Sequence, residues 1–174
     1  MTGRLARLRV PLGFAAAVVA LAWARPTWAS WLTGAPVALA GEALRCWAAG
    51  HLEKSREVTR SGPYRYLRHP LYVGSTLIGA GFVVAAHSLL VALVVALYLG
   101  ATLIAAIRAE EAHLDEKFEG AYAEYRAGRA HAMSRRFSWS RLHANREARA
   151  ILGLVVGFAF LAWRARGSTW FDAP

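Results

Sequence analysis

The sequence predicts an all-α membrane protein, a multi-pass bundle of about five transmembrane helices with one polar pocket at its cytoplasmic end. Two observations support this prediction. Of the 174 residues, 56% are hydrophobic and only 18% are charged, which is too apolar for an ordinary soluble domain of this length. The apolar residues also form long runs, which two polar segments interrupt. We therefore expect a single integral membrane domain over residues 1–174.

The first 50 residues predict a helical hairpin. Residues 10–24 (VPLGFAAAVVALAWA) and most of 30–50 are apolar, and Arg25–Pro26 separates the two runs. A cleavable signal peptide is the alternative for the first run, because arginines precede its short apolar core and Ala22–Ala24 resembles a cleavage site. We favour the hairpin because a second apolar run follows at once.

The longest uncharged run covers residues 71–107, which contain no Asp, Glu, Lys or Arg. One straight helix of this length would reach about 55 Å, whereas the hydrocarbon core of a bilayer is about 30 Å thick. The run must therefore cross the membrane twice. His87 and Ser88 at its middle mark the turn, which predicts helices over 71–86 and 89–107.

A last apolar run, ILGLVVGFAFLAW, covers residues 151–163 within a predicted C-terminal helix over 148–174. As a helix the run would reach only about 20 Å, which is short for a membrane span. It either crosses the membrane with its flanking arginines snorkelling to the surface or lies at the interface. The sequence leaves both alternatives open.

Positively charged residues set the predicted orientation, because cytoplasmic loops of membrane proteins carry an excess of Lys and Arg. An N-terminus in the cytoplasm puts most basic residues on that side, including Arg4, Arg7 and Arg9 and the polar segments 51–70 and 108–147. The two polar segments would then share one face of the membrane and can build one site. The arginine-rich, lysine-poor composition favours a prokaryotic source, so we expect the inner membrane of a prokaryotic cell.

Several classes of partner are disfavoured. The net charge of +10 is spread around apolar segments and no nucleic-acid-binding motif occurs, so we expect membrane lipids and no nucleic acid as partners. Cys46 is the only cysteine, which excludes an intramolecular disulfide and a cysteine-based metal centre. The six histidines show no metal-ligand spacing, so we expect no metal.

Two further patterns lie within the apolar runs. We expect Glu42 and Arg45, three residues apart on one helix, to pair with each other. No strand precedes the glycines of the later runs, so these are expected to permit close helix packing rather than to form a nucleotide-binding loop. They are Gly74, Gly79, Gly81 and Gly100.

The first polar segment ends in SGPYRYLRHPLYVG, residues 61–74. Gly62–Pro63 signals a turn, and Pro70 disfavours helical backbone at His69, so the next helix should begin just after it. Tyr64, Arg68 and His69 would then be held on extended backbone at the membrane surface. Tyrosines and arginines also serve as interfacial anchors that need no ligand. The density of polar side chains argues against that interpretation for the cluster as a whole.

The second polar segment begins RAEEAHLDEKFEGAYAEYR, residues 108–126. Residues at spacings of three and four share one helical face, and here they are Glu111, Leu114, Phe118, Tyr122 and Tyr125. Glu110 and His113 should point away from that face. A carboxylate on a buried stripe needs a cation or hydrogen-bond donors. Arg108, three residues before Glu111, is a purely structural partner in one interpretation.

The sequence GPYRYLRHPLYVG, followed after two apolar helices by RAEEAHLDEKFEGAYAEY, resembles a known family of integral membrane methyltransferases. The family is typified by isoprenylcysteine carboxyl methyltransferase and has the phospholipid N-methyltransferases as relatives. The similarity covers about residues 50–126, and the pair of motifs is specific whereas either alone is weak. It implies that S-adenosyl-L-methionine (SAM) binds on the cytoplasmic side. It also implies that a lipophilic acceptor enters from the bilayer and that 51–147 is the cofactor-binding and catalytic core.

The resemblance implies roles for individual residues. The positions that match the cofactor-binding tyrosine and the Arg-His-Pro-x run are Tyr64, Arg68, His69, Pro70 and Leu71. The carboxylate of the second motif, which holds the cofactor, corresponds to Glu111. Further cofactor contacts are implied before Gly62, at His51, Val58 and Thr59. Arg108 and Tyr72 would face the acceptor, and Arg108 and Glu111 are the expected catalytic residues.

The chemistry of SAM agrees with these roles. Arg68 can bind the carboxylate of SAM in a fork, Glu111 can accept from its ribose diol or ammonium, and Tyr64 can cover a ring. Methyl transfer is a direct displacement, so the protein mainly aligns the reacting groups. A carboxylate acceptor is already ionised and needs no general base, whereas a protonated amine must first lose a proton.

The expected function is SAM-dependent methylation of a lipophilic carboxylate, as in O-methylation of an isoprenylcysteine. The chain departs from the family after Tyr125, where RAGRAHAMSRRF replaces the usual Arg/Val-Pro stretch, and this leaves the acceptor open. A phospholipid amine N-methyltransferase, an NADPH-dependent enzyme similar to sterol reductases and a non-enzymatic membrane scaffold are the alternatives. The adjacent Glu110 and Glu111 favour a methyltransferase over a reductase.

Overall fold

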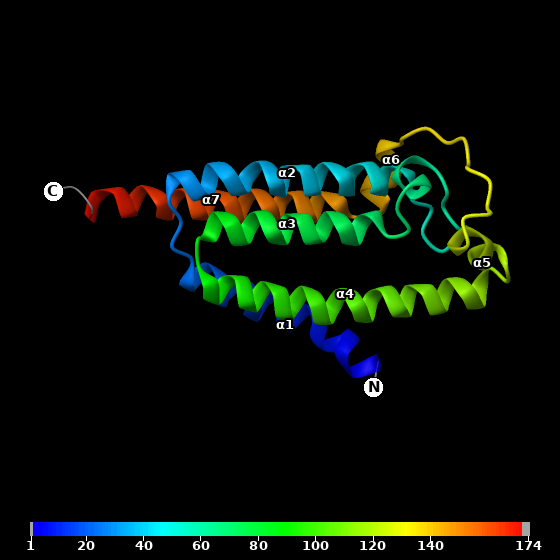
Figure 1. Cartoon of the computed structure of the whole chain (residues 1–174), viewed down its shortest axis with the longest axis horizontal. Coiled ribbons are helices and arrows are strands. Elements are labelled where there is room, and N and C mark those ends of the chain that lie inside the picture. Colours follow the sequence, from blue (N-terminus) through cyan, green and yellow to red (C-terminus); the bar gives the residue numbers. More distant parts are fainter. Residues whose placement is uncertain (1, 172–174) are drawn as a thin grey trace.

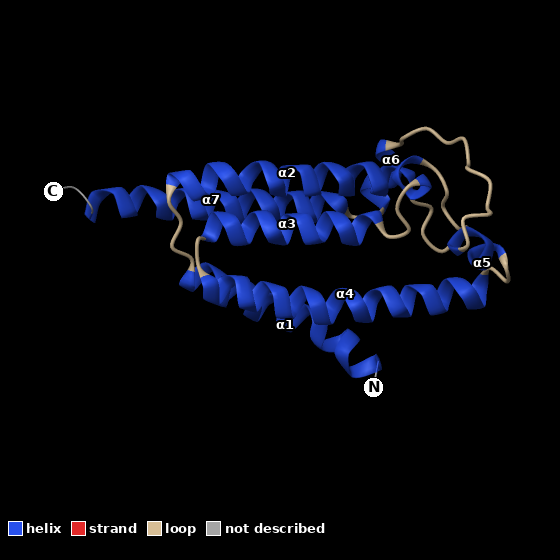
Figure 2. Cartoon of the chain, viewed as in Figure 1, coloured by secondary structure: helices blue, strands red, loops and turns tan. Residues whose placement is uncertain are grey.

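The structure is a computed structural model that describes the backbone of residues 2–171 and the side chains of residues 13–167. This part of the chain forms seven α-helices and one 3-10 helix and contains no strand (Figure 2). The prediction of an all-α fold is therefore confirmed. The long helices are α1 (Thr2–Trp23), α2 (Trp28–His51), α3 (Pro70–Ala86), α4 (Leu89–Lys117) and α7 (Glu147–Phe171). The short ones are η1 (Gly62–Arg65), α5 (Ala121–Arg126) and α6 (Trp139–Ala144).

The turn between α3 and α4 lies at the predicted place. His87 ends α3 in the left-handed region, with φ of 48°, and the Ser88 side chain caps α4 by accepting a hydrogen bond from the Val91 amide at 3.5 Å. Pro70 opens α3, and His69 just before it has non-helical backbone angles, as expected for a residue that precedes proline. Helix α4 runs to Lys117 rather than ending at 107, because the charged residues after the apolar run are good helix formers.

The long helices lie in two layers (Figure 1). Helices α2, α3 and α7 lie side by side, and α4 runs alongside α1 in the second layer. The short turns after α1 and α3 lie at one end. The loop after α2, η1, α5 and α6 lie at the other end. Both polar segments of the sequence therefore meet at the same end of the helices, as predicted.

The apolar core sits near the end with the short turns. Trp31 reaches across from α2 to α7, where its indole N–H donates to the Phe158 carbonyl at 2.9 Å. A backbone hydrogen bond also joins the turn after α1 to the end of α3, because the Arg25 amide donates to the Ala86 carbonyl oxygen at 2.8 Å. Most core side chains are small, which lets the helices approach closely. The buried cluster consists of Ala20, Ala24, Ala35, Ala38, Ala85, Ala86, Val91, Phe158 and Leu161.

Glycines allow α2 and α3 to pack backbone against backbone. A Cβ added to Gly34 would lie 2.3 Å from the Gly81 carbonyl oxygen, and one added to Gly41 would lie 2.6 Å from that of Gly74. No real Cβ is tolerated at such distances, so only glycine fits at these crossings. The packing role predicted for Gly74 and Gly81 is confirmed.

The other two predicted packing glycines differ. Gly79 faces α4, since a Cβ there would lie 2.4 Å from Leu99 Cδ1. Gly100, on α4, has open space around its Cβ position, with no heavy atom within 4 Å. The packing prediction is therefore wrong for Gly100, which is exposed and has no neighbour to pack against.

Two described helices are long and apolar enough to cross a membrane: α4 and the part of α7 from Glu147 to Gly167. Large apolar side chains on both are exposed, for example Leu97 at 74% and Trp163 at 67%. Helix α7 extends to Phe171 and is longer than the apolar run that predicts it, which removes the length objection to a membrane span. The apolar parts of α1 and α3 are shorter. The side chains of Arg4, Arg7 and Arg9, which support the predicted orientation, lie outside the described residues.

Candidate functional site

A cavity of about 630 Å³ lies at the polar end of the helices. Small-molecule sites in proteins span about 300–1,000 Å³, so the cavity is large enough for a cofactor. Its walls come from the loop after α2, from η1, from the last turns of α4, from α5 and from the start of α7. Elements from both polar segments of the sequence thus contribute to one space.

The turn at Gly62 places Tyr64 in the cavity wall. Gly62 has φ of 56°, and a Cβ there would lie 2.5 Å from the ring of His51, so both the backbone angle and the space require glycine. His51 is buried beneath the turn, with Nδ1 3.1 Å from Ser61 Oγ. Tyr64 is 8% exposed and lines the cavity. It lies on η1, so the prediction of extended backbone is wrong for Tyr64: the turn begun by Gly62–Pro63 continues into a helical turn.

The two motifs meet at the carboxylate of Glu111. Its Oε1 lies 3.0 Å from His69 Nε2 and accepts a hydrogen bond from the Tyr122 hydroxyl at 3.1 Å. A guanidinium nitrogen of Arg68, Nη1, lies 4.0 Å from the same oxygen. Glu111 therefore joins the Arg-His-Pro corner, the end of α4 and α5. The Arg68 side chain is 53% exposed and lines the cavity, so it is available to an anionic ligand.

Tyrosines tie α5 to the first motif. The Tyr125 hydroxyl donates to the Tyr64 carbonyl at 2.7 Å and also contacts the Leu67 carbonyl at 3.3 Å. Burial raises the pKa of Tyr125 to about 12 and also raises the pKa of Tyr64 and Tyr122. All three hydroxyls are therefore protonated at neutral pH, and those of Tyr122 and Tyr125 donate hydrogen bonds.

The structure brings part of the predicted site to the cavity wall. Six predicted residues line the cavity: Val58, Thr59, Tyr64, Arg68, Leu71 and Tyr72. Five others are not among the lining residues: His51, His69, Pro70, Arg108 and Glu111. Of these, His51 and Pro70 are buried and Arg108 is exposed, while His69 and Glu111 hold the corner behind Arg68.

Two polar residues of α4 line the cavity although the helical pattern predicts only that they point away from the apolar stripe: Glu110 and His113, beside Leu114. The prediction of one helical face over 111–125 is wrong, because α4 ends at Lys117 and the stripe residues Tyr122 and Tyr125 lie on α5. Glu111 marks the side of α4 that contacts Tyr122 of α5 and His69. The cavity opens over the adjacent side. A periodicity argument locates a packed face and gives no information on a hollow next to it.

A polar cluster deeper in the cavity was not predicted from the sequence. Arg45 Nε lies 2.6 Å from Glu147 Oε1 on α7, and both residues line the cavity. The expected partner Glu42 is farther away, with Oε2 3.9 Å from Arg45 Nε, and this oxygen makes no hydrogen bond. The Arg45 guanidinium also donates to the Ser75 hydroxyl. The only signal in the sequence is the presence of charged residues inside apolar runs.

The fold and the cavity define a class: a helical membrane protein with a polar cofactor-sized site at one end of its helices. Comparison with known families gives the family within that class. Residues 43–121 match the family model described as phospholipid methyltransferase. Over these residues the chain is similar to the integral membrane methyltransferases, which include the phospholipid and isoprenylcysteine carboxyl methyltransferases. No curated protein and no solved structure gives a significant match.

Proposed function

We propose that this protein is a SAM-dependent methyltransferase that acts on a lipophilic acceptor where the membrane meets the cytoplasm. The observation that supports this most is the corner formed by Arg68, His69 and Glu111 beside the cavity. His69 and Glu111, one from each motif, lie 42 residues apart in the chain, and a contact of 3.0 Å joins them. The match to the phospholipid methyltransferase model covers the first motif and the second as far as residue 121.

The cavity offers a complement for each polar part of SAM. Arg68 is half-exposed and can bind the SAM carboxylate in a fork. Tyr64 presents an aromatic ring for the adenine. Glu110 can accept hydrogen bonds from the ribose diol or the ammonium group. We propose that Glu111 fixes Arg68 and His69, and that Val58 and Thr59 complete the wall.

When bound, SAM supplies a methyl group on a positively charged sulfur, which an acceptor can displace directly. The chain then has to hold the acceptor in line and restrict water. A carboxylate acceptor attacks without a general base, and we propose this acceptor class first. Tyr72, on the cavity wall, and the exposed Arg108 are the proposed acceptor-side residues.

A phospholipid amine is the second candidate acceptor, because the matching family model is described as phospholipid methyltransferase. A protonated amine must lose a proton before it attacks. Glu110 and His113 line the cavity and are side chains able to take that proton. If the acceptor is an amine, Glu110 and His113 can therefore remove its proton, a step that a carboxylate acceptor does not require.

We further propose that the whole chain is one membrane domain with five crossing helices and with its N-terminus and cavity in the cytoplasm. Support comes from the exposed apolar surfaces of the long helices and from the gathering of both polar segments at one end (Figure 1). The excess of basic residues in these segments agrees with a cytoplasmic location.

Product identification tests the function. Membranes that contain the protein are incubated with methyl-labelled SAM, and lipids and small molecules are extracted. We expect label in the lipophilic fraction that alkali releases as methanol, as for a methyl ester. Alkali-stable label in a phospholipid headgroup would assign the amine acceptor instead. A wild-type protein that transfers no more label than Arg68→Ala would contradict the proposed function.

A further inference from the structure

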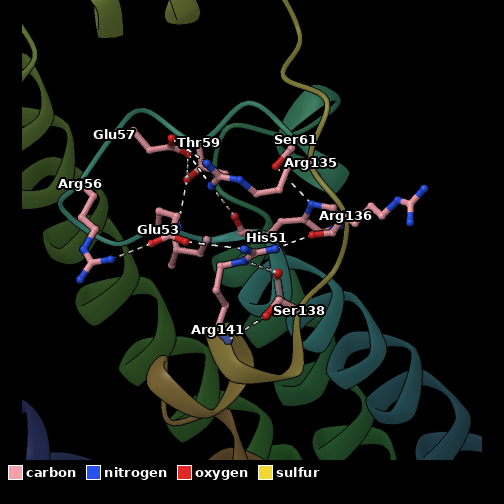
Figure 3. A network of polar contacts seen from close by, with 12 residues as sticks. His51, Glu53, Arg56, Glu57, Thr59, Ser61, Arg135, Arg136, Ser138 and Arg141 are labelled. Atoms are coloured by element: carbon pink, nitrogen blue, oxygen red, sulfur yellow. Dashed lines mark hydrogen bonds and ion pairs between the residues drawn. The ribbon is translucent and has the colours of Figure 1, made fainter.

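The loop between α2 and η1, residues 52–61, supplies Val58 and Thr59 to the cavity wall but has no regular secondary structure. A downstream segment, residues 133–141, lies against this loop (Figure 3). The segment follows the part of the chain that matches the family model, which ends at residue 121. We call residues 133–141 the strap.

Arg135 of the strap makes the closest charged contact with the loop. Its guanidinium donates two hydrogen bonds to the carboxylate of Glu57, at 2.6 and 2.8 Å. The Arg135 and Glu57 side chains are only 21% and 27% exposed, so solvent screens the pair less than a surface ion pair. The geometry is bidentate, which fixes direction as well as distance.

Glu57 itself lines the cavity and connects this pair to Thr59. The Thr59 hydroxyl contacts Glu57 Oε1 at 3.5 Å, and the same hydroxyl accepts a hydrogen bond from the Glu53 amide at 3.3 Å. A continuous series of contacts thus leads from Arg135 through Glu57 to Thr59, which lines the cavity. Displacing Glu57 would release Thr59 on one side.

The strap also holds the start of the loop. Arg141 donates from Nε to the Gly50 carbonyl at 2.8 Å, and its Nη1 lies 3.6 Å from Glu53 Oε1. The Ser138 amide donates to the same Gly50 carbonyl at 3.0 Å. Phe137 covers Gly50 so closely that a Cβ there would lie 2.1 Å from its ring. The strap is therefore packed against the last turn of α2, where the loop begins, as well as paired with the loop.

We propose that Arg135, acting through Glu57, is a positioning residue that fixes the loop 52–61 in the shape required to bind SAM. This inference rests on the proposed function, because it takes SAM, the methyl donor, as the ligand that binds against the part of the cavity wall that contains Thr59. Arg135 itself is not among the residues lining the cavity. Replacing Arg135 should therefore weaken the binding of SAM and leave the methyl-transfer step unchanged.

The chain offers a matched control for Arg135. Arg136 is its neighbour, is exposed, and in Figure 3 its side chain points away from the network. Arg136→Glu makes the same charge change as Arg135→Glu at the next position. The exchange Glu57→Arg with Arg135→Glu restores the pair with reversed charges. Purified full-length proteins in lipid nanodiscs are compared for all of these.

Two measurements separate positioning from a general loss of structure. The first is the KM for SAM alongside kcat. For Arg135→Glu we expect the KM for SAM to rise about tenfold with kcat within about twofold of wild type, as for the loss of a partly buried charged hydrogen bond. The second, independent of SAM, is trypsin cleavage after the exposed Lys54 and Arg56 of the loop. Cleavage there should become faster in Arg135→Glu and stay unchanged in Arg136→Glu.

The charge exchange decides between positioning and misfolding. Recovery of both the KM and the resistance to trypsin in the exchanged protein supports the proposal, even if Arg135→Glu alone folds poorly. Equal behaviour of Arg135→Glu and Arg136→Glu in both measurements overturns it. An exchanged protein that is cut after Lys54 and Arg56 as fast as Arg135→Glu also overturns it; this cleavage is the deciding readout because Glu57 itself lines the cavity. A wild-type protein that does not use SAM refutes the proposed function, and the trypsin result still shows separately whether the strap holds the loop.

Discussion

At the scale of single residues, one carboxylate oxygen organises the site. Glu111 Oε1 is within 3.1 Å of donors from His69 and Tyr122, and Arg68 Nη1 lies 4.0 Å away. Donors from two elements, the segment before α3 and α5, converge on this oxygen of α4, so each constrains the others. The Tyr122 side chain is fully buried, at 1% exposure, and its hydroxyl is the donor from α5.

Removing the Tyr122 hydroxyl tests this convergence. Tyr122→Phe keeps the ring and deletes the hydrogen bond to Glu111, so we expect a loss of about 1 kcal/mol in the free energy of unfolding. A rise of about fivefold in the KM for SAM should accompany it, because Arg68 and His69 lose a fixed partner. Tyr66→Phe is the control, since Tyr66 is 78% exposed. Equal stability and kinetics of the two variants would show that the Tyr122 hydroxyl is unimportant.

His51 makes the stability of the loop depend on pH. Burial and the nearby Arg141 and Arg135 lower the pKa of His51, so it is neutral in the folded protein at neutral pH. The unfolded chain takes up the proton first, at a pH of about 6.5. The contribution of neutral His51 to the free energy of unfolding is therefore fully present above a pH of about 6.5. It is lost as the pH falls through the lower pKa that His51 has in the folded protein.

Thermal unfolding in nanodiscs measures this effect. On acidification from about pH 8 to about pH 5.5, the midpoint of the wild type should fall more than that of His51→Asn. Asparagine keeps a hydrogen-bonding group near Ser61, which contacts His51 at 3.1 Å, but cannot titrate. Equal falls in the two proteins would show that His51 does not cause the dependence.

At the scale of elements, the contact between α2 and α3 fixes the loop that joins them. The two helices cross at glycines, and the cavity wall begins where this contact ends, after His51 and before Pro70. Separating the helices would shift both ends of the connection between them, residues 52–69, which includes η1 and Tyr64.

A methyl group at a crossing tests the packing of these helices. In Gly81→Ala the new Cβ would lie 2.5 Å from the Ala38 amide nitrogen, so the backbones must move apart. We expect a loss of about 1–3 kcal/mol in the free energy of unfolding, as for overpacked cores. Gly100→Ala is the control on α4, where the space is open, and it should be neutral or slightly stabilising because alanine favours helix. A Gly81→Ala protein as stable as the control would refute the close crossing.

The positions of the long helices were predictable because they follow from the lengths of the apolar runs and from the charged residues that separate these runs. The run 71–107 is too long for one span, and the turn at His87 and Ser88 follows from that. The end of α4 and the short α5 and α6 were not predictable, because 108–149 has no apolar run to mark its ends.

The site was predictable only in part. The contact of Glu111 with the Arg-His-Pro corner follows from the resemblance of the paired motifs. The cavity position of Glu110 was not predictable, because helical periodicity locates packed faces and not hollows. The Arg45–Glu147 pair joins residues 102 apart in the chain, and nothing local in the sequence indicates such a contact. Binding of the donor by any of these residues stays a prediction.

At the scale of the whole molecule, both polar segments lie at one end and the short turns at the other (Figure 1). The proposed topology therefore requires that Arg56 and Arg129 face the cytoplasm and that His87 face the opposite side. All three side chains are exposed. The single native cysteine, Cys46, can be replaced by serine so that one introduced cysteine at a time is followed.

Labelling with a membrane-impermeant maleimide tests this topology. In sealed inside-out vesicles, Arg56→Cys and Arg129→Cys should react and His87→Cys should not. Right-side-out vesicles should give the opposite pattern, with total labelling after detergent as the control. Reaction of Arg56→Cys and Arg129→Cys from opposite sides would separate the two polar segments and exclude a shared site.

Equilibrium binding of SAM to the purified protein in nanodiscs tests most directly whether the joined motifs form a donor site. Calorimetric titration should give one SAM per chain and no binding of NADPH. Glu111→Gln should weaken SAM binding about tenfold, whereas Glu116→Gln, at an exposed position on the same helix, should bind like the wild type. No SAM binding by the wild type, binding of NADPH in its place, or equal affinities of the two variants would contradict a donor site at this corner.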